Sequence, residues 1–426
     1  MSTKNINIDV HHVTRVEGHG NINVEIENGE IKKIQWSVPE APRFFEAMVV
    51  GRDCREVQPI TSRICGICSI AHSFASLKAT EAAFGITISE QTKRLRKILN
   101  HGENLQSHIL HIGYLALPDF FEANSVIPLV SSHKEAVLTV VKLHRLANET
   151  CDIIGGRTTH PIRACIGGFT KLPEEKQLIE LKKRYESALK DLNFLADFIV
   201  SISSLIPNFT RETEYISIFD KSEYALYDGV IKSSDKKDTI AVSEYLKVTN
   251  EYMTPYSTAK WTKFNRDSYM VGALARFNNN STQLTSLAKA TAQKVGLTAP
   301  CYNPYFNTIA QLVECVYSVE RVIEHLDWLL NNKIKEEDIS FKPKEGRGIG
   351  VIEAPRGILF HDYTYDNKGI CVKANCIIPT NQNHANIQQD MESLVPLYKD
   401  KGKERLQLLL EMLVRAYDPC ISCSTH

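Results

Sequence analysis

The sequence predicts an α+β protein that is predominantly helical, with a core of long helices and small antiparallel sheets near the N-terminus and at about residues 348–380. Three patterns predict this class: strand-like alternation at the start, long segments with helical spacing in the middle, and a strand–turn–strand pattern near the end. A chain of 426 residues with 43% hydrophobic residues can form a large core. We expect one large domain spanning residues 1–426.

The first predicted element is a β region over residues 1–41. In the segment NINVEIENGEIKKIQW, alternation places three apolar side chains on one face, those of Ile22, Val24 and Ile26. Asn28 followed by Gly29 is a strong signal for a tight hairpin turn. A helix is then predicted over residues 42–51, with proline at its start and glycine at its end.

Long helices follow, because apolar residues recur at helical spacing between breaker residues. Their expected ranges are 68–84, 90–115, 133–154, 172–196, 281–295 and 307–330. The stretch 208–262 is richer in turn residues and aromatic residues, and we expect an irregular excursion there. Between residues 348 and 380 the pattern returns to strand, turn and strand, with the turn at 366–369.

The last predicted element is a C-terminal helix with a metal-binding tail, residues 403–426. Leucines recur in the helix at i, i+3, i+4 and i+7, at Leu406, Leu409, Leu410 and Leu413. Pro419 ends this helix, because the residue before a proline is displaced from the α conformation. The tail then reads DPCISCSTH, so two cysteines lie close to the final residue.

Composition excludes several function classes. Lys plus Arg and Asp plus Glu are both 50, so no basic field indicates nucleic acid or a membrane surface. The most apolar stretch, FIVSISSLI, is too short to span a bilayer. The N-terminal segment lacks the apolar core of a signal peptide, and the eleven cysteines are therefore expected to be reduced thiols in the cytoplasm.

Four cysteines form two C-x-x-C pairs at opposite ends of the chain, Cys65 with Cys68 and Cys420 with Cys423. Structural zinc is the common use of such pairs, and a redox dithiol is a second possibility. Soft thiolates also suit nickel or an iron–sulfur cluster. Both pairs lie in apolar, helical surroundings, which favours a buried metal that must be kept from water over an exposed zinc knuckle.

These motifs resemble those of the large subunit of nickel–iron hydrogenases. The first is RxCGxCxxxH, formed by Arg63, Cys65, Gly66, Cys68 and His72, and the second is the terminal DPCxxCxxH. The blocks RVEGHG, PRFFEAMVVGRD, GGRTTHP, EAPRGIL and RAYDPCISC occur in the order of that family, so the resemblance spans the chain. The residues of several blocks are most similar to those of the cytoplasmic, bidirectional, cofactor-coupled branch that includes the sulfhydrogenases.

The resemblance implies a catalytic subunit that splits H2 reversibly and heterolytically into protons and electrons. It implies nickel on four thiolates and an iron atom that carries two cyanides and one carbon monoxide. By position, Cys65 and Cys420 are the terminal nickel ligands, whereas Cys68 and Cys423 bridge to iron. Cys420 is then expected to take the proton, and Glu17 to accept it next.

The same resemblance assigns residues around the metals. Arg356 is expected over their open side, where it favours negative charge, with Asp418 beside it. His72 is expected to form a hydrogen bond near a bridging sulfur. Four further residues are expected to line the pocket or meet a cyanide, namely Pro355, Leu359, Pro379 and Thr380. Ser107 falls where many relatives carry an acid, so an additional carboxylate there is in doubt.

A hard cation is expected to hold the C-terminus. The resemblance implies magnesium bound by Glu46, the backbone carbonyl of Cys376 and the terminal His426, with waters completing the shell. In this family a maturation endopeptidase removes an extension after the terminal histidine. A chain that ends at His426 is therefore expected to be the mature product.

The electrons need a partner, because the other seven cysteines have no cluster spacing and no G-x-G-x-x-G motif is present. The resemblance implies an obligate iron–sulfur small subunit, with flavin or nicotinamide subunits beyond it. A membrane-linked or bifurcating hydrogenase stays open as an alternative, as does a non-catalytic four-thiolate zinc scaffold.

Overall fold

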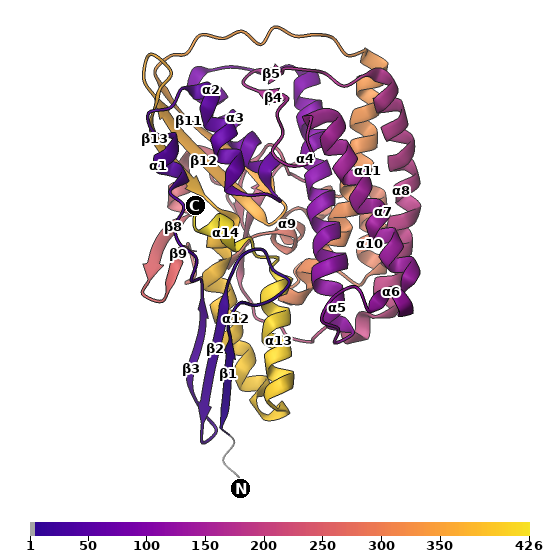
Figure 1. The fold of residues 1–426 in the computed structure, drawn as a ribbon, viewed down its shortest axis with the longest axis vertical. Helices are drawn as coiled ribbons and strands as arrows, with labels where there is room; N and C mark the ends of the chain where they lie inside the picture. Colours follow the sequence, from indigo (N-terminus) through magenta and orange to yellow (C-terminus); the bar gives the residue numbers. More distant parts are fainter. Residues whose placement is uncertain (1–4) are drawn as a thin grey trace.

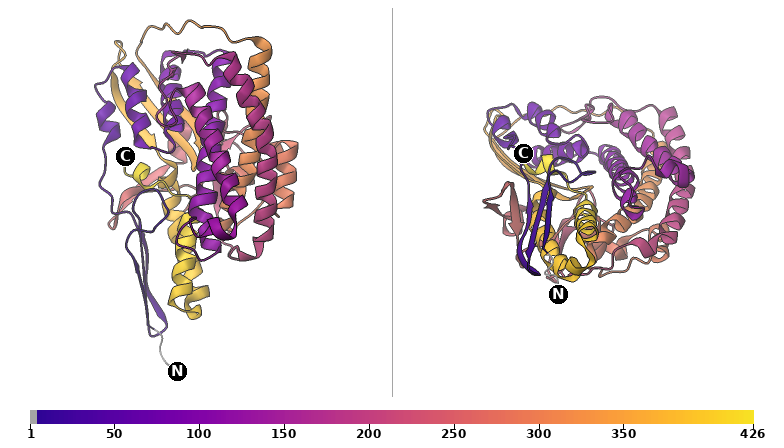
Figure 2. Two further views of the ribbon diagram at one scale, coloured as in Figure 1. Left: turned by 45° about the vertical axis from the view of Figure 1, so that its right-hand side comes forward. Right: turned by 60° about the horizontal axis from the view of Figure 1, so that its bottom comes forward.

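A computed structural model describes residues 5–426 and shows two connected halves (Figure 1). Long helices stand side by side in one half, and small sheets with shorter helices form the other, an arrangement that Figure 2 shows from two further directions. One large hydrophobic cluster runs through both halves and includes the four cysteines of the two pairs. The predominantly helical α+β class is therefore confirmed. Within residues 5–426, no helix combines the length and the apolar character needed to cross a membrane.

The N-terminal sheet has three antiparallel strands in the order β1-β2-β3, with bounds Ile6–Val10, Asn21–Glu27 and Glu30–Ser37. The predicted hairpin turn is present, and Asn28 and Gly29 both have positive φ, at 52° and 83°. Ile22, Val24 and Ile26 are buried, as their alternation predicts. Residues 1–4 of the predicted β region lie outside the described residues.

The helix predicted over residues 42–51 is shorter than expected. Only α1, Phe45–Val49, is helical, because Phe44 before it has a left-handed conformation with φ 58°. A second helix that the sequence did not reveal, α2 at Cys54–Thr61, follows after a capping box at Asp53. It leads through a 3-10 turn at Ser62–Ile64 to the first cysteine pair.

The predicted long helices are present. Gly85 ends α3 with a left-handed φ of 66°, and Ser89 caps α4 by accepting a hydrogen bond from the Thr92 N–H. The bounds are α3 Ser69–Phe84, α4 Glu90–Leu110, α7 Lys134–Thr150, α8 Glu175–Ser201, α10 Ser286–Lys294 and α11 Asn307–Asn332. Short π-helical segments extend α4 over His111–Ala116 and α7 over Cys151–Gly155. Two single-turn helices, α5 at Leu117–Phe120 and α6 at Leu129–Ser132, join them.

The expectation of an irregular excursion at 208–262 is wrong, because this stretch contains four short strands. They are β6 Glu214–Phe219, β7 Val230–Ser233, β8 Asn250–Thr254 and β9 Ser257–Lys263. Strand β6 also pairs in parallel with β10, Tyr269–Met270, about fifty residues further along the chain. Pairing between such distant segments leaves little trace in local alternation.

The β region predicted at 348–380 is a three-stranded antiparallel sheet, β11 Gly346–Ala354, β12 Gly357–Tyr365 and β13 Cys371–Ile377. The predicted turn joins β12 to β13. A second, tight turn at Pro355 and Arg356 was missed, so the region has three strands instead of two. Helix α3 packs on this sheet at close range, since a Cβ on Gly350 would lie 2.0 Å from the Ala75 carbonyl oxygen.

Two helices beneath the site were not predicted, α9 at Ala273–Asn280 and α12 at Pro379–Tyr398. Helix α12 begins with polar residues that are all buried, namely Asn381, Gln382, Asn383, His384 and Asn386. No apolar periodicity marks it, because its buried side is polar, and Gln382, Asn383 and Asn386 form hydrogen bonds to neighbouring elements. The predicted C-terminal helix is present as α13, Lys403–Ala416, and a last turn, α14 at Ile421–Ser424, carries the tail back into the core (Figure 1).

Candidate metal centre

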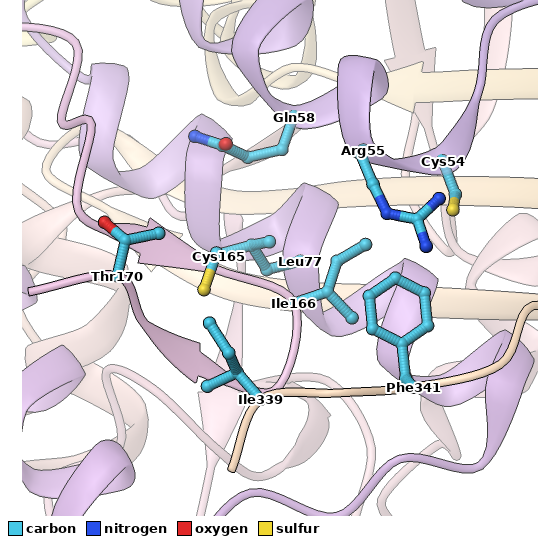
Figure 3. A pocket seen from close by; sticks show the side chains of 9 residues that line it. All are labelled: Cys54, Arg55, Gln58, Leu77, Cys165, Ile166, Thr170, Ile339 and Phe341. Carbon is cyan, nitrogen blue, oxygen red and sulfur yellow. The ribbon is translucent and has the colours of Figure 1, made fainter. Parts of the chain in front are cut away.

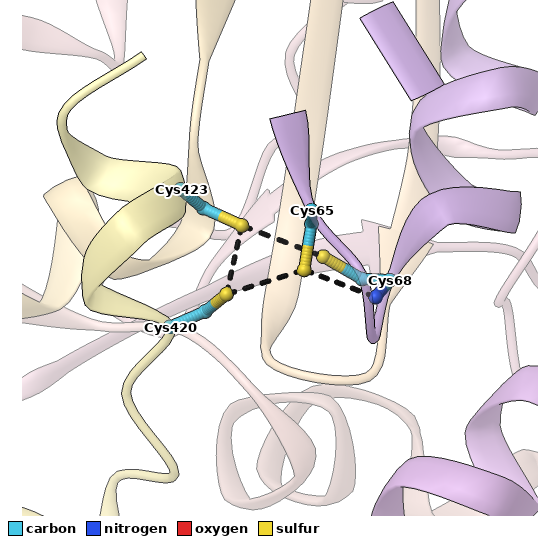
Figure 4. Close-up of side chains that lie close together, drawn as sticks. All are labelled: Cys65, Cys68, Cys420 and Cys423. Carbon is cyan, nitrogen blue, oxygen red and sulfur yellow. Dashed lines mark hydrogen bonds between the residues drawn. The ribbon is translucent and has the colours of Figure 1, made fainter. Parts of the chain in front are cut away.

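The two cysteine pairs meet in one buried cluster (Figure 4). The four Sγ atoms of Cys65, Cys68, Cys420 and Cys423 all lie within 4.8 Å of one another. The shortest Sγ–Sγ separations are 2.7 Å between Cys420 and Cys423, 3.3 Å between Cys65 and Cys420, and 3.7 Å between Cys68 and Cys423. None of the four is more than 5% exposed. Two distant segments thus supply a tetrathiolate site inside the core.

Local structure aims the sulfurs inward. Cys68 is the N-cap of α3, and the Cys65 Sγ accepts the N–H groups of Ile67 and Cys68, both at 3.2 Å. At the other end, Asp418 takes a left-handed φ of 50° between α13 and α14, which turns the chain toward the first pair. Burial raises the pKa of the Cys420 and Cys423 thiols well above the ordinary value. A cation is therefore needed before all four sulfurs can become thiolates together.

Glu17 lies directly against the tail. Its Oε2 is 3.2 Å from the Cys420 Sγ and accepts the Ser422 N–H at 3.1 Å. Its backbone carbonyl accepts the Ile421 N–H at 2.9 Å, so side chain and backbone are both fixed to the tail. The Glu17 side chain is half-buried and joins the cluster to the outside. The structure therefore brings this predicted residue to Cys420.

Arg356 is buried at the tight β11–β12 turn and is paired with Asp418. Its Nε donates to the Asp418 carbonyl at 2.7 Å and to Oδ1 at 3.1 Å, and its Nη2 donates to Oδ1 at 2.8 Å. The Gln311 amide donates to the other carboxylate oxygen at 3.0 Å. Burial disfavours the charged guanidinium, but Asp418 and the cysteines hold the pKa of Arg356 well above its ordinary value. The third nitrogen, Nη1, is buried and has no partner within residues 5–426.

The turn that carries Arg356 rests on a buried ion network that sequence reasoning missed. Arg276 of α9 donates to the Ala354 and Pro355 carbonyls at 3.0 and 2.9 Å. The same guanidinium makes ion pairs with Glu314 at 2.6 Å and Glu353 at 2.8 Å. Nothing in the sequence marks these residues, because the partners are 38 and 77 positions from Arg276. The network fixes the backbone of the turn and so the position of Arg356.

The remaining predicted pocket residues lie on elements that reach the cluster. Thr380, on the first turn of α12 beside Pro379, accepts the Cys420 N–H on its Oγ1 at 2.9 Å. His72 lies on the first turn of α3, where its backbone N–H bonds to the Cys68 carbonyl at 3.1 Å. Pro355 and Leu359 are buried on the β11–β12 hairpin, but no hydrogen bond or ion pair joins their side chains to the cluster.

The three residues expected to bind magnesium converge at the end of the chain. His426 Nε2 lies 2.9 Å from the Cys376 carbonyl oxygen and 3.7 Å from Glu46 Oε1. Glu46 Oε1 also accepts the Cys376 N–H at 2.7 Å. Although burial raises the pKa of Glu46, His426 and this N–H hold it below its ordinary value. The His426 side chain is only 2% exposed, so the chain end is tied into the core.

Two more residues around the cluster escaped sequence reasoning. The Arg43 Nη2 donates to the Ile64 carbonyl at 2.6 Å and to the Ser422 carbonyl, and so ties the two cysteine segments together. Glu103 of α4 is fully buried and accepts the Ile70 and Ala71 N–H groups at 2.6 and 2.9 Å, which caps α3 just after Cys68. Burial raises the pKa of Glu103 to about 8.

Ser107, also on α4, is buried and its hydroxyl has no partner within residues 5–426. A separate cavity of about 260 Å³ lies between α2, the β4–β5 hairpin (Ala164–Cys165 and Gly168–Phe169) and the segment 333–345 (Figure 3). Its lining is mainly apolar, and it includes none of the predicted site residues. The chemistry therefore belongs to the thiolate cluster.

Comparisons with known proteins agree with this geometry. Residues 43–136 and 202–426 match the family model described as nickel-dependent hydrogenase, and residues 7–41 match one described as HoxL-like. Sulfhydrogenase 1 of Pyrococcus furiosus has an alpha subunit that is 34% identical over 98% of this chain and 97% of its own length. The corresponding chain of the F420-non-reducing hydrogenase vhu of Methanocaldococcus jannaschii is 32% identical over 87% of this chain and 94% of its own length.

Solved structures show the same fold. An NAD+-reducing [NiFe]-hydrogenase in the H2-reduced state superposes with a TM-score of 0.91 at 25% identity, covering 99% of both chains. A [NiFeSe] hydrogenase variant from Desulfovibrio vulgaris Hildenborough gives 0.78 at 22% identity over the full length of both chains. The resemblance noted in the motifs is confirmed, and sulfhydrogenase alpha subunits are among the relatives. The chain belongs to the nickel-dependent hydrogenase family, and it is a large, catalytic subunit of a nickel–iron hydrogenase.

Proposed function

We propose that Cys65, Cys68, Cys420 and Cys423 hold a nickel–iron centre at which this subunit cleaves H2 reversibly. The observation that carries the proposal is the convergence of four buried sulfurs from the two ends of the chain, within 4.8 Å of one another. In this proposal Cys65 and Cys420 would hold nickel alone, and Cys68 and Cys423 would hold both nickel and iron. Soft thiolates suit both metals.

The residues around the sulfurs fit such a centre better than a lone zinc ion. One buried donor next to the cluster, Arg356 Nη1, has no partner within residues 5–426. An unsatisfied buried polar group costs about 1–3 kcal/mol, so this atom indicates a bound group that the protein itself does not supply. A zinc ion satisfied by four thiolates would offer it nothing. Iron-bound cyanide would accept from Arg356, and from the Thr380 hydroxyl, whose oxygen already accepts the Cys420 N–H.

We assign the iron two cyanides and one carbon monoxide on these grounds and on the family resemblance. Pro355, Leu359 and Pro379 would form the apolar wall of the pocket. Arg356 is a fixed cation above this pocket. Its Nε and Nη2 both donate to the Asp418 carboxylate, so only Nη1 is free to donate to a ligand. When bound, the metal pair supplies the site for heterolytic cleavage of H2 and takes up the electrons.

The protein's own residues then move the proton. Cys420 is the base, and Glu17 is the next acceptor because its Oε2 lies 3.2 Å from the Cys420 Sγ. The Ser422 N–H holds that oxygen in place at 3.1 Å, so the carboxylate needs no rearrangement to receive a proton. Glu17 is half-buried, and the proton can therefore leave toward the surface through it.

A magnesium ion at Glu46, the Cys376 carbonyl and His426 completes the proposal. Carboxylate, carbonyl and a few waters form a typical magnesium shell, and the single histidine supplies the remaining protein ligand. The convergence of the three groups supports this site. Its role would be to hold the final residue, and with it the turn that carries Cys420 and Cys423.

The electrons must leave through another chain. Within residues 5–426, the only group of three or more His, Cys, Asp and Glu side chains placed to hold a metal is the four-cysteine cluster, so no second cluster is available to carry electrons. We propose that the partner is an iron–sulfur small subunit, followed by a nicotinamide- or flavin-dependent subunit. The likeness to the sulfhydrogenase alpha subunits and to the NAD+-reducing structure supports this arrangement. The likeness to the sulfhydrogenase type also supports a cytoplasmic complex.

The test is metal analysis and infrared spectroscopy of the purified complex, with H2–D2 exchange measured on the same sample. We expect nickel and iron in the large subunit, stretching bands of bound cyanide and carbon monoxide, and exchange activity. Zinc as the only metal, without those bands and without exchange, would overturn the proposal.

A further inference from the structure

Behind the cluster, three fully buried side chains form one hydrogen-bonded chain. His72 Nδ1 lies 3.1 Å from His361 Nε2, and His361 Nδ1 lies 2.5 Å from the Tyr363 hydroxyl. None of the three residues is exposed. The free end of the chain is His72 Nε2, which is buried and has no partner within residues 5–426. The chain thus runs from the β12 strand to the start of α3.

The fold brings these residues together directly. His361 and Tyr363 are two positions apart on β12, so both point to the same face of the sheet. Helix α3 lies on that face at backbone distance, because glycines on β11 leave no side chain in between: a Cβ on Gly348 would lie 2.0 Å from the Ala79 carbonyl oxygen. His72 is on the first turn of α3, four residues after Cys68.

His361 is neutral and Tyr363 is protonated near neutral pH. Burial lowers the pKa of His361 well below its ordinary value. Burial also raises the pKa of the Tyr363 hydroxyl well above its ordinary value. A neutral imidazole has one N–H donor and one acceptor nitrogen, so the direction of donation along the chain determines each tautomer.

One direction suits every group in the chain. Within residues 5–426, the Tyr363 hydroxyl forms a hydrogen bond only with His361 Nδ1, so its buried phenolic hydrogen has an acceptor only if it is donated there. His361 must then carry its hydrogen on Nε2 and donate to His72 Nδ1. His72 consequently carries its hydrogen on Nε2, at the free end. The opposite direction would leave the Tyr363 hydrogen without an acceptor and a lone pair at His72 Nε2.

We propose that Tyr363 and His361 are positioning residues that fix the tautomer of His72, so that its Nε2–H donates toward the thiolates of the metal cluster. His72 lies beside the first cysteine pair, since its backbone N–H bonds to the Cys68 carbonyl at 3.1 Å and the charge of Cys65 acts on its ring. The inference rests on the proposed nickel–iron centre. A donor N–H withdraws electron density from a thiolate and therefore from the metals, and a lone pair in its place would not.

Three variants of the purified complex test this, with the infrared bands of the iron ligands as readout and nickel content as the check of assembly. Tyr363→Phe removes only the hydroxyl that sets the direction, and His361→Leu breaks the chain. Both are expected to retain nickel and to move the bands to lower wavenumber, because the metals keep more electron density. His361→Gln is expected to restore the wild-type bands, since a carboxamide can accept from Tyr363 and donate to His72.

The matched control is Tyr365→Phe. Tyr365 lies on the same strand, and its hydroxyl bonds to Thr80 of α3 at 2.8 Å and not to His361. The infrared bands of the Tyr365→Phe complex should therefore stay at the wild-type positions. Wild-type band positions in both Tyr363→Phe and His361→Leu would overturn the inference. If Tyr363→Phe loads no nickel, the test is the comparison of His361→Leu with His361→Gln. Identical infrared bands in these two variants would again refute the proposal. A wild-type complex without any such bands would instead refute the proposed function.

Discussion

Replacing Glu17 with glutamine removes an acid but keeps nearly the same size and shape. The glutamine oxygen can still accept the Ser422 N–H that Oε2 now accepts at 3.1 Å, so we expect the tail and the metals to stay in place. What is lost is a proton acceptor 3.2 Å from the Cys420 Sγ. A positioned general base contributes about 10²–10⁴-fold to a rate. At about 1.36 kcal/mol per tenfold change, the barrier should rise by roughly 3–5 kcal/mol.

The assay is H2–D2 exchange and H2 oxidation by the purified complex, with nickel content measured in parallel. Glu40→Gln is the control, because that carboxylate lies beside the same segment but its Oε1 accepts the His19 N–H at 2.7 Å. We expect the control to retain wild-type exchange. Near-wild-type exchange in a Glu17→Gln complex with full nickel content would show that the proton leaves by another route.

Three further predictions follow from the geometry. Arg356→Lys keeps the charge but loses the paired hydrogen bonds of Nε and Nη2 to Asp418, so turnover should fall at least about tenfold with nickel retained. Unchanged turnover would contradict the role of these hydrogen bonds. Glu314→Gln breaks the buried pair with Arg276, and the melting midpoint should fall by the equivalent of about 3–5 kcal/mol. Burial raises the pKa of Glu314, but Arg276 holds it at about 2. The stabilisation from ionised Glu314 is therefore fully present above about pH 4.3, and the difference in melting midpoint between wild type and variant should narrow as the pH falls from there toward 2. Glu46→Gln should lower magnesium content and speed release of the last residue by carboxypeptidase, and equal content and release would argue against the magnesium site.

The cluster and its partners could be predicted because their signals are local. The two C-x-x-C pairs are short, local signals that bring out the four cysteines, and the family resemblance of the blocks around them adds Glu17 and Arg356. The structure adds that these residues are in contact. The long helices were predictable for the same reason, since their apolar spacing is contained within each helix.

Residues whose role depends on distant partners could not be found this way. Arg276 and Glu314 are ordinary charged residues on two helices until the fold pairs them, and His361 is one histidine on a strand. Helix α12 was missed because its buried side is polar, and the parallel pairing of β6 with β10 was missed because the two strands are about fifty residues apart in the chain. In each case tertiary contacts, and not local propensity, decide the structure.

The most direct test of the central claim is anomalous diffraction from crystals of the assembled complex, recorded at the nickel, iron and zinc absorption edges. The proposed centre predicts one nickel peak within bonding distance of all four sulfurs, those of Cys65, Cys68, Cys420 and Cys423, with an iron peak next to Cys68 and Cys423. A single zinc peak among the four sulfurs, or an iron peak beside Cys65 and Cys420 instead, would contradict it.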